Sequence, residues 1–407
     1  MAIMTETTLS PRRDAQICAL IGTGHFLSHF YMLCLPPLFL AWRAEFDVSF
    51  AMLGLSVALM SGTTALLQTP VGFLVDRHGA RPFLVGGTLL MALSIAAMAF
   101  VNDYRLILAL AVLSGIGNSV IHPADYAILA GSVRKEFMGR AFALHTFTGN
   151  LGFAMAPPVI ALLLLVMDWR GALLLVGLLG VPVVGAILLQ SRILADQPKA
   201  RGPKPVGGAR LLTSKPILAF FAFFLLSAMA GSGVTTFLIA VLGVLWATPV
   251  AIASVALTGY MAGATGGTLV GGWWADKKGG NLLGFVVVLT GIAMALILSM
   301  GLVDWAPWLL LPVAFAAGLC LGASRTPRDV MLKDACPPGE VGKVFGFVSA
   351  GLPLGSALVP VPMGFLIDLG FAWAVLPVVA LLLGLSLLCA GAARGLAPRR
   401  VQAQPAE

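Results

Sequence analysis

The stretch Gly72-Phe73-Leu74-Val75-Asp76-Arg77-His78-Gly79-Ala80-Arg81 places charged residues and two glycines between two long apolar segments. A weaker copy, Gly272-Trp273-Trp274-Ala275-Asp276-Lys277-Lys278-Gly279, follows at an offset of 200 residues and also separates two apolar segments. A repeat of this kind predicts a membrane protein of two related halves. Such internal repeats are the usual architecture of secondary transporters.

The composition supports this interpretation. Of the 407 residues, 59% are hydrophobic and only 10% are charged, whereas a soluble domain carries roughly 25% charged residues. Lipid is therefore the expected surroundings of most of the chain, which is long enough for about a dozen spans of about 20 residues each. We predict an all-α membrane protein with twelve transmembrane helices in two pseudo-symmetric six-helix bundles.

Twelve spans can be placed along the sequence, and each must be helical because hydrocarbon cannot satisfy exposed backbone groups. A polar segment rich in proline, glycine and basic residues interrupts them at 193–214. We therefore expect an N-terminal bundle at 1–192, a cytoplasmic linker at 193–214 and a C-terminal bundle at 215–407. The predicted spans are 15–41, 49–75, 82–101, 105–130, 138–166, 170–192, 215–245, 249–275, 281–303, 306–333, 341–367 and 371–393.

The distribution of lysine and arginine predicts the orientation. The side that carries both termini and the linker holds most of these residues, and the opposite side holds only Arg43, Arg105 and Arg170. The positive-inside rule then places both termini in the cytoplasm of a bacterial-type inner membrane. The net charge of +8 is explained by anionic lipid headgroups and requires no nucleic acid. We read the first apolar run as a retained anchor and expect a monomer, because each pair of halves encloses its own cavity.

The duplication extends beyond the two short polar gaps. His122-Pro123-Ala124-Asp125 on the fourth span matches Thr326-Pro327-Arg328-Asp329 on the tenth span at an offset of 204 residues. Gly139-Arg140 matches Gly342-Lys343 at an offset of 203 residues. Landmarks in the same order at nearly one offset indicate a parallel repeat of one half against the other.

At this point the chain resembles the major facilitator superfamily over its whole length. The first polar gap fits that family's signature loop, glycine-x-x-x-aspartate-arginine-x-glycine-x-arginine. The resemblance implies that this loop stabilises the contact of the two halves on the cytoplasmic side and sets the balance between outward-open and inward-open states. The signature positions are Gly72, Asp76, Arg77, Gly79 and Arg81, and the weaker copy keeps Asp276 and Gly279.

Within that superfamily the chain is similar to the fosmidomycin-resistance branch of exporters. The similarity rests on 115–123, with the sequence GIGNSVIHP, and on 149–157, which begins GNLG and ends in Ala156-Pro157. The chain departs from these families at two positions. The acidic residue after His122-Pro123 comes one residue later than in the fosmidomycin-resistance branch, at Asp125. The arginine that many drug/proton antiporters carry on the fourth span would fall near Ala111 and is missing here. The resemblance implies proton-coupled export. A proton gradient is then the expected energy source, and no cofactor is expected.

Four histidines lie inside predicted spans, at His25 and His29 on the first, His122 on the fourth and His145 on the fifth. An ionisable residue within a membrane span is a functional candidate by default. Histidine titrates near physiological pH, which suits proton coupling. His25 and His29 are four residues apart and so share one helix face. The alternative for each is a hydrogen-bonded packing histidine.

The fourth span also carries a polar stripe, because Ser114, Asn118, His122 and Asp125 are spaced at i, i+4, i+8 and i+11. An aspartate at a helix centre costs roughly 2.5–3.5 kcal/mol on insertion scales. The stripe must therefore face protein or water. We take Asn118, His122 and Asp125 as proton or substrate candidates. The alternatives are a structural polar seam, or a carboxylate close enough to the cytoplasm to cost little.

The tenth span carries Arg325, Arg328, Asp329 and Lys333. Asp329 is four residues from both Arg325 and Lys333, which predicts neutralisation within the helix and leaves Arg328 without a local partner. One hypothesis is that Asp125 contacts Arg325 or Arg328 and so closes the cytoplasmic side. The alternative is that the arginines extend to the headgroups.

Two further features have plain interpretations. Gly263, Gly267 and Gly271 recur every four residues on the eighth span and predict a helix-packing seam. Arg43, Glu45 and Asp47 resemble an ordinary solvated loop.

Three transport functions remain open from the residues alone. The first is proton-coupled export of a drug-like or metabolite molecule. The second is proton-coupled uptake of a small organic anion, because Arg325 and Arg328 would form an electropositive site. A metal-ion carrier is disfavoured because no acidic or thiolate ligands cluster with the histidines, so no metal site is predicted. An enzyme is not expected, since the sequence has no phosphate loop, dinucleotide fingerprint or nucleophile elbow.

Overall fold

The computed structural model describes residues 10–134, 137–194, 212–275, 281–336 and 341–396, and the regular structure in that part is helical throughout. Twelve helical segments are long and apolar enough to cross a membrane. Their ends agree with the predicted spans to within a few residues. The predicted linker lies largely outside the described residues.

The described part of the first half contains nine α-helices and three short 3-10 segments. These are α1 (Pro11–Leu33), η1 (Pro36–Leu38), α2 (Phe39–Phe46), α3 (Phe50–His78), α4 (Arg81–Ala97), η2 (Met98–Phe100), α5 (Tyr104–Ser119), α6 (Ile121–Ser132), α7 (Met138–Leu163), α8 (Trp169–Leu178) and α9 (Gly180–Leu189), followed by η4 (Ser191–Ile193).

The second half begins with long helices and ends in shorter ones. Its elements are α10 (Lys215–Trp246), α11 (Val250–Ala275), α12 (Leu282–Leu302), α13 (Pro307–Ala335), α14 (Val341–Ser349), α15 (Gly351–Leu358), α16 (Pro360–Asp368), η5 (Ala372–Ala374) and α17 (Val375–Leu396).

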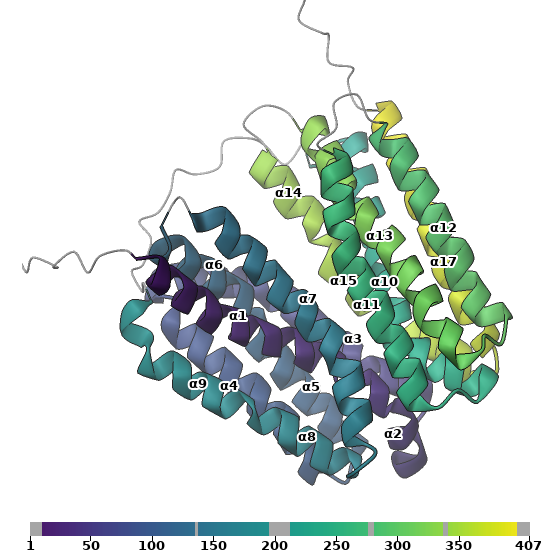
Figure 1. The fold of residues 1–407 in the computed structure, drawn as a ribbon, viewed down its shortest axis with the longest axis horizontal. Helices are drawn as coiled ribbons and strands as arrows, with labels where there is room; N and C mark the ends of the chain where they lie inside the picture. The colour runs from purple at the N-terminus through teal and green to yellow at the C-terminus, as the bar shows by residue number, and fades with distance from the viewer. Residues whose placement is uncertain (1–9, 135–136, 195–211, 276–280, 337–340, 397–407) are drawn as a thin grey trace, which may run out of the picture.

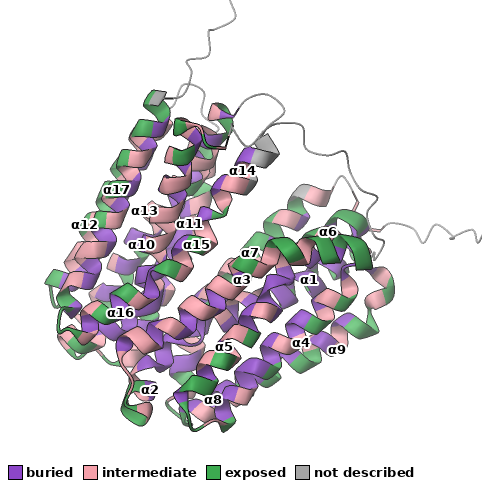
Figure 2. Cartoon of the chain, turned by 180° about the vertical axis from the view of Figure 1, so that it is seen from behind, coloured by how far each residue is buried: buried purple, intermediate pink, exposed green. Residues whose placement is uncertain are grey.

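The helices form two bundles, one from each half of the chain (Figure 1). The bundles meet at the end where α2 lies and spread apart toward the opposite end, which carries the start of α1 and the end of α17. Contacts between the halves join α3 to α15 and α16, and α7 to α11. Buried residues face the interior of each bundle, whereas many exposed ones, among them large apolar side chains, face outward (Figure 2). Apolar outer faces are expected for helices surrounded by lipid.

The signature stretch is more helical than its polarity suggests. Helix α3 continues through His78, and α4 begins at Arg81, so the turn consists of Gly79 and Ala80. Gly79 has a φ of 92°, which a residue with a Cβ rarely adopts. The glycine therefore permits the sharp reversal between the two spans.

The fourth span is broken where the sequence places Pro123. Helix α5 ends at Ser119, Val120 stands between, and α6 begins at Ile121. Proline has no backbone N–H and its ring collides with the carbonyl of residue i−4, which here is Ser119. The proline therefore explains why the span is interrupted one turn before it, and His122 and Asp125 stand on the second of the two helices.

The predicted glycine seam lies between α11 and α13. A Cβ built on Gly263 would collide with the carbonyl oxygen of Phe315, and one built on Gly267 with the carbonyl oxygen of Leu319. Gly318, on the opposite helix, would collide in the same way with the carbonyl of Tyr260. The two backbones are therefore in direct contact, and small residues are required there.

Replacing Gly267 by alanine should destabilise the protein. The added methyl group has no room against the backbone of α13, and overpacking of this kind costs about 1–3 kcal/mol. We expect a lower melting temperature for the purified protein in detergent. The matched control is Gly266→Ala, where the nearest atom is the flexible Cδ1 of Leu319 at 4.0 Å. Equal melting temperatures for the two variants would contradict the packing argument.

The end at which the bundles meet is held by Asp368 from α16. Its carboxylate accepts hydrogen bonds from the backbone N–H groups of Phe50 at 2.6 Å and Ala51 at 2.8 Å, at the start of α3. Arg43 also lies 3.4 Å from this carboxylate. Arg43 and Glu45 are exposed, as predicted, but the predicted loop is wrong for them because both lie in helix α2. Their long side chains reach partners on other helices, and Glu45 pairs with Arg170.

Removing the Asp368 carboxylate should open this end of the molecule. Ser49 remains the N-cap of α3, and losing this additional acceptor of N–H groups in the first turn costs, by analogy with a cap, about 0.5–2 kcal/mol. Such a cost changes the ratio of two conformations roughly two- to thirtyfold. In a cysteine-free background, spin labels at Ala44 and Phe371 would report the separation, and Asp368→Ala should enrich the longer distances. Asp47→Asn is the control, because Asp47 is exposed and asparagine tolerates its left-handed conformation. Identical distance distributions for both variants would refute the role of Asp368.

Candidate functional site

The four intramembrane histidines meet in one cluster beside Asp125. His25 and His29 come from α1, His122 and Asp125 from α6, and His145 from α7. The rings of His25 and His145 are stacked with 3.6 Å between their centroids, and the His25 ring lies 4.4 Å from His29 and 5.1 Å from His122. In the sequence, His25 and His29 form a pair, His122 and Asp125 belong to a polar stripe, and His145 stands alone. The packing of three helices unites them.

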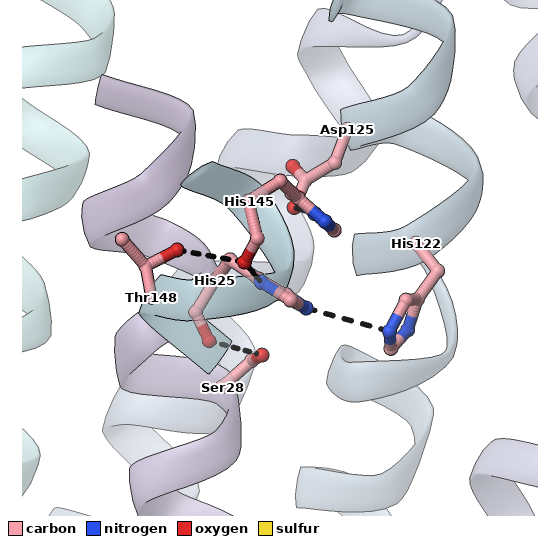
Figure 3. A network of polar contacts seen from close by, with 6 residues as sticks. All are labelled: His25, Ser28, His122, Asp125, His145 and Thr148. Carbon is pink, nitrogen blue, oxygen red and sulfur yellow. Dashed lines mark hydrogen bonds and ion pairs between the residues drawn. The ribbon is translucent and has the colours of Figure 1, made fainter. Parts of the chain in front are cut away.

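A hydrogen bond to one backbone carbonyl fixes the ring of His25 (Figure 3). Its Nδ1 lies 2.7 Å from the carbonyl oxygen of His145. A carbonyl can only accept, so Nδ1 carries the proton, and Nε2 of the neutral ring presents a lone pair. That Nε2 faces Nε2 of His122 at 3.4 Å. Thr148 donates to the same His145 carbonyl at 2.9 Å, which further holds this turn of α7 in place.

Asp125 and His145 form a fully enclosed pair. The side chains are 0% and 2% exposed, and Oδ2 of Asp125 lies 3.0 Å from Nε2 of His145. The second carboxylate oxygen is buried and has no hydrogen-bond partner within the described residues. A buried carboxylate is costly unless it is paired with a cation or protonated. The pair is therefore chemically suited to hold and release one proton.

Asn118 takes a different position from the rest of the predicted stripe. Its Nδ2 lies 3.3 Å from Oγ1 of Thr64 on α3 and 3.1 Å from Sδ of Met32 on α1. The break at Val120 separates this residue from the histidine cluster. Asn118 Oδ1 and Ser114 Oγ are buried without partners in the part of the chain that the structure describes.

A cavity of about 420 Å³ lies between the two bundles. Met32 and Phe153 line it from the first half, and Tyr260, Arg325 and Arg328 from the second. Several serine and threonine hydroxyls complete the wall, and none of the described lining residues is a carboxylate. The cavity is thus electropositive and rich in hydrogen-bond donors. Phe153 also connects the two regions, because its ring lies 4.2 Å from that of His29.

The arginines of α13 are paired differently from the prediction. Arg328 contacts the carboxylate of Asp329 at 2.9–3.0 Å and its guanidinium stands 3.9 Å above the ring of Phe224. The predicted pairs of Asp329 with Arg325 and Lys333 are therefore wrong in this structure, because the flexible Arg328 side chain folds back onto the neighbouring carboxylate. Arg325 is exposed and makes no ion pair among the described residues. The hypothesised contact of Asp125 with either arginine is not formed here.

The signature residues lie at the spread end of the first bundle. Asp76 and Arg77 are exposed, and Arg81 donates from Nε to the carbonyl of Leu194 at 2.9 Å, just after η4. Arg13 binds the neighbouring carbonyl of Ile193 at 3.1 Å. These bonds satisfy the end of the sixth span within its own bundle. Gly72 faces Pro123 of α6, and Asp276 and Gly279 lie outside the described residues, so the signature role in the contact of the halves stays a prediction.

The sequence interpretation missed the second-half wall of the cavity. Tyr260 and the hydroxyls of α10 were not selected, although Ser227, Gly231 and Thr235 stand at i, i+4 and i+8 on the seventh span. Small and hydroxylated residues at that spacing on a membrane helix are a usable signal for a polar face. Asp14 was also missed; it is 0% exposed and binds Arg134 at 2.6 Å.

Comparisons with known proteins agree with this architecture. The Escherichia coli fosmidomycin resistance protein is 23% identical over 367 residues, which cover 86% of this chain and 87% of that protein. Human monocarboxylate transporter 11 is 30% identical over 324 residues, covering 74% and 66% of the two chains. A probable L-galactonate transporter of Escherichia coli is 28% identical over 139 residues, but this match spans only 31% of that relative's length.

A solved structure and a family sequence profile also match this chain. A bacterial homologue of the human lysosomal transporter Spinster, in an inward-facing and occupied conformation, superposes with a TM-score of 0.79 at 14% identity, over 98% of this chain and 100% of that one. The sequence profile of the Major Facilitator Superfamily matches residues 21–246 and again 224–407. Together with the twelve spans and the repeated halves, this shows that the chain belongs to the Major Facilitator Superfamily of membrane transporters.

Proposed function

We propose that this transporter exports a small drug-like or metabolite molecule in exchange for protons, by alternating access of the central cavity. The observation that carries the proposal is the enclosed Asp125–His145 pair, stacked against His25. A titratable pair inside the membrane-spanning region is the feature that a proton-coupled carrier needs. The likeness of most of the chain to the fosmidomycin resistance protein supports export.

The exchange would work through the charge on the pair. When Asp125 is ionised, His145 must carry the compensating positive charge, because an unpaired buried charge is expensive. When one proton leaves, the pair has to be stabilised by another conformation or another partner. Conformations that differ in their affinity for the proton are thereby coupled to the proton gradient. The gradient across the cytoplasmic membrane is the proposed energy source, and a monomer is the proposed functional unit.

A second candidate is proton-coupled uptake of a small organic anion. The cavity favours it specifically, because Arg325 and Arg328 line it and no carboxylate is among its described lining residues. Arginine presents paired donors to carboxylate and phosphate groups. Both candidates share the same proton site and differ in the direction in which substrate and proton move.

Replacing Asp125 by asparagine should abolish coupled transport. Asparagine keeps the shape of the side chain but cannot take up or release the proton. We would measure compound tolerance, with fosmidomycin and assorted amphiphilic drugs, in an efflux-deficient bacterial host with membrane expression matched between variants. Wild type should protect against at least one compound, and Asp125→Asn should protect no better than empty vector.

The control for that experiment is Asp103→Asn. Asp103 is an exposed N-cap of α5, with its side chain accepting from the N–H of Arg105, and asparagine caps a helix equally well. Wild-type tolerance should be retained. If wild type protects against nothing, export is contradicted, and proteoliposomes with an internal pH dye would test organic-anion uptake. Protection by Asp125→Asn equal to wild type would remove the carboxylate from the coupling mechanism.

Replacing Arg325 by alanine tests the cavity as an anion site. A hydrogen bond to a charged group is worth about 1.5–3 kcal/mol, so the KM for an anionic substrate should rise roughly 10- to 150-fold. Neutral compounds should be affected much less. Arg105→Ala, at an exposed position in the first bundle, is the control. An equal rise of KM for neutral and anionic compounds would argue against charge recognition.

A further inference from the structure

The histidine cluster contains a second arrangement that proton coupling does not use. Ligand nitrogens of His25, His29 and His122 all lie within 4.8 Å of one another. The three rings come from α1 and α6, and the side chains of His29 and His122 are only half-buried. We propose that these three histidines form a binding site for one divalent transition-metal ion of the zinc, cobalt or nickel type.

The spacing of the first two ligands already matches such an ion. Nε2 of His25 and Nε2 of His122 are 3.4 Å apart. In a tetrahedral site with metal–nitrogen bonds of about 2.0–2.1 Å, two ligand nitrogens stand about 3.4 Å apart. The ligand nitrogen of the third histidine, His29, lies within 4.8 Å of the other two. Three protein ligands leave one coordination position for water or another molecule.

One of the three rings makes the hydrogen bond that is expected of a metal ligand. Metal-binding histidines usually donate their other N–H to a carbonyl or carboxylate, which fixes the lone pair toward the ion. Nδ1 of His25 does this with the carbonyl of His145 at 2.7 Å, so its Nε2 faces the proposed site. Nδ1 of His29 and of His122 are buried without a hydrogen-bond partner among the described residues. These two nitrogens are therefore not held by any other group in the described part of the chain.

The chemistry of the donors selects the ion. Three neutral imidazoles suit zinc, cobalt, nickel and copper, whereas magnesium and calcium require oxygen ligands. A carboxylate stands one ring away from the trio, because His145, which stacks on His25, contacts Asp125. Tyr126, with its ring 6.3 Å from that of His122, is the other titratable group beside the trio.

Gly149 on α7 provides the room for two of the ligands. A Cβ added there would lie 2.5 Å from Cε1 of His25 and 2.9 Å from Cε1 of His29. Gly149→Ala therefore displaces both rings while leaving every histidine in the chain. This variant separates the geometry of the site from the mere presence of imidazoles.

The test is direct metal binding to the full-length purified protein, prepared without a polyhistidine tag. Zinc would be titrated calorimetrically, and cobalt would be followed by its visible absorption, whose intensity reports tetrahedral coordination. We expect one ion per chain for wild type. His29→Gln, His122→Gln and Gly149→Ala should each weaken binding by about tenfold or more. His78→Gln, at the exposed end of α3, should bind as wild type does.

Thermal melting supplies a second measurement that does not depend on transport. An ion that binds the folded protein raises its melting temperature, so zinc should stabilise wild type and His78→Gln but not the three site variants. Melting of the variants without zinc shows whether they are folded. No binding to wild type would overturn the proposal. So would unchanged binding in folded site variants, because the ion would then lie elsewhere. Neither result affects the proposed proton coupling at Asp125.

Discussion

The absence of hydrogen-bonding solvent in the hydrocarbon layer constrains every polar group of this protein. Backbone groups are satisfied by helices, but the polar side chains within the spans have to find partners inside the bundles. Asp125 finds His145, Asp14 finds Arg134, and Arg328 finds Asp329 and the face of Phe224. Others, such as Tyr31 and Tyr104, donate to backbone carbonyls of neighbouring helices. The unusual positions in this chain are therefore those where the constraint is only partly met, such as the second oxygen of Asp125.

Close contact between helix backbones makes these partnerships possible. Lipid provides no hydrophobic force that would drive helices together, so their association depends on packing at small residues. The same device recurs at three places: Gly267 against Leu319 between α11 and α13, Gly152 against Phe26 between α7 and α1, and Gly364 against Phe50 between the two halves. The contact of α1 with α7 is what stacks His25 on His145. The glycine content that would argue against helices in water thus supports both the fold and the site.

The sequence predicted the fold in detail and the site only in its components. Span number and approximate ends follow from hydropathy, and the repeat follows from the matched motifs around Pro123 and Pro327. The membership of Asp125 and the four histidines in a candidate site also followed from their depth in the spans. Their mutual distances did not, because these depend on the rotation of α1, α6 and α7 about their axes and on the break at Val120. The predicted ion-pair partners of Asp329 were wrong for a similar reason. Helical spacing restricts which carboxylates a long arginine side chain can reach, but its rotamer decides which of them it contacts.

The distribution of charge between the two halves has a mechanistic consequence. The first half presents titratable imidazoles and a carboxylate, whereas the cavity wall of the second presents fixed guanidinium charges and hydroxyls. A proton that binds in the first half changes the charge of the site, while the charge of Arg325 stays constant across physiological pH. Phe153 lies between the two, in contact with His29 and lining the cavity. In the proposed exchange, the bound proton and the bound substrate therefore influence each other through electrostatic interaction and through the Phe153 ring. No residue has to bind both of them. In the proposed mechanism, that separation assigns the coupling proton to the first half and the choice of substrate to the second.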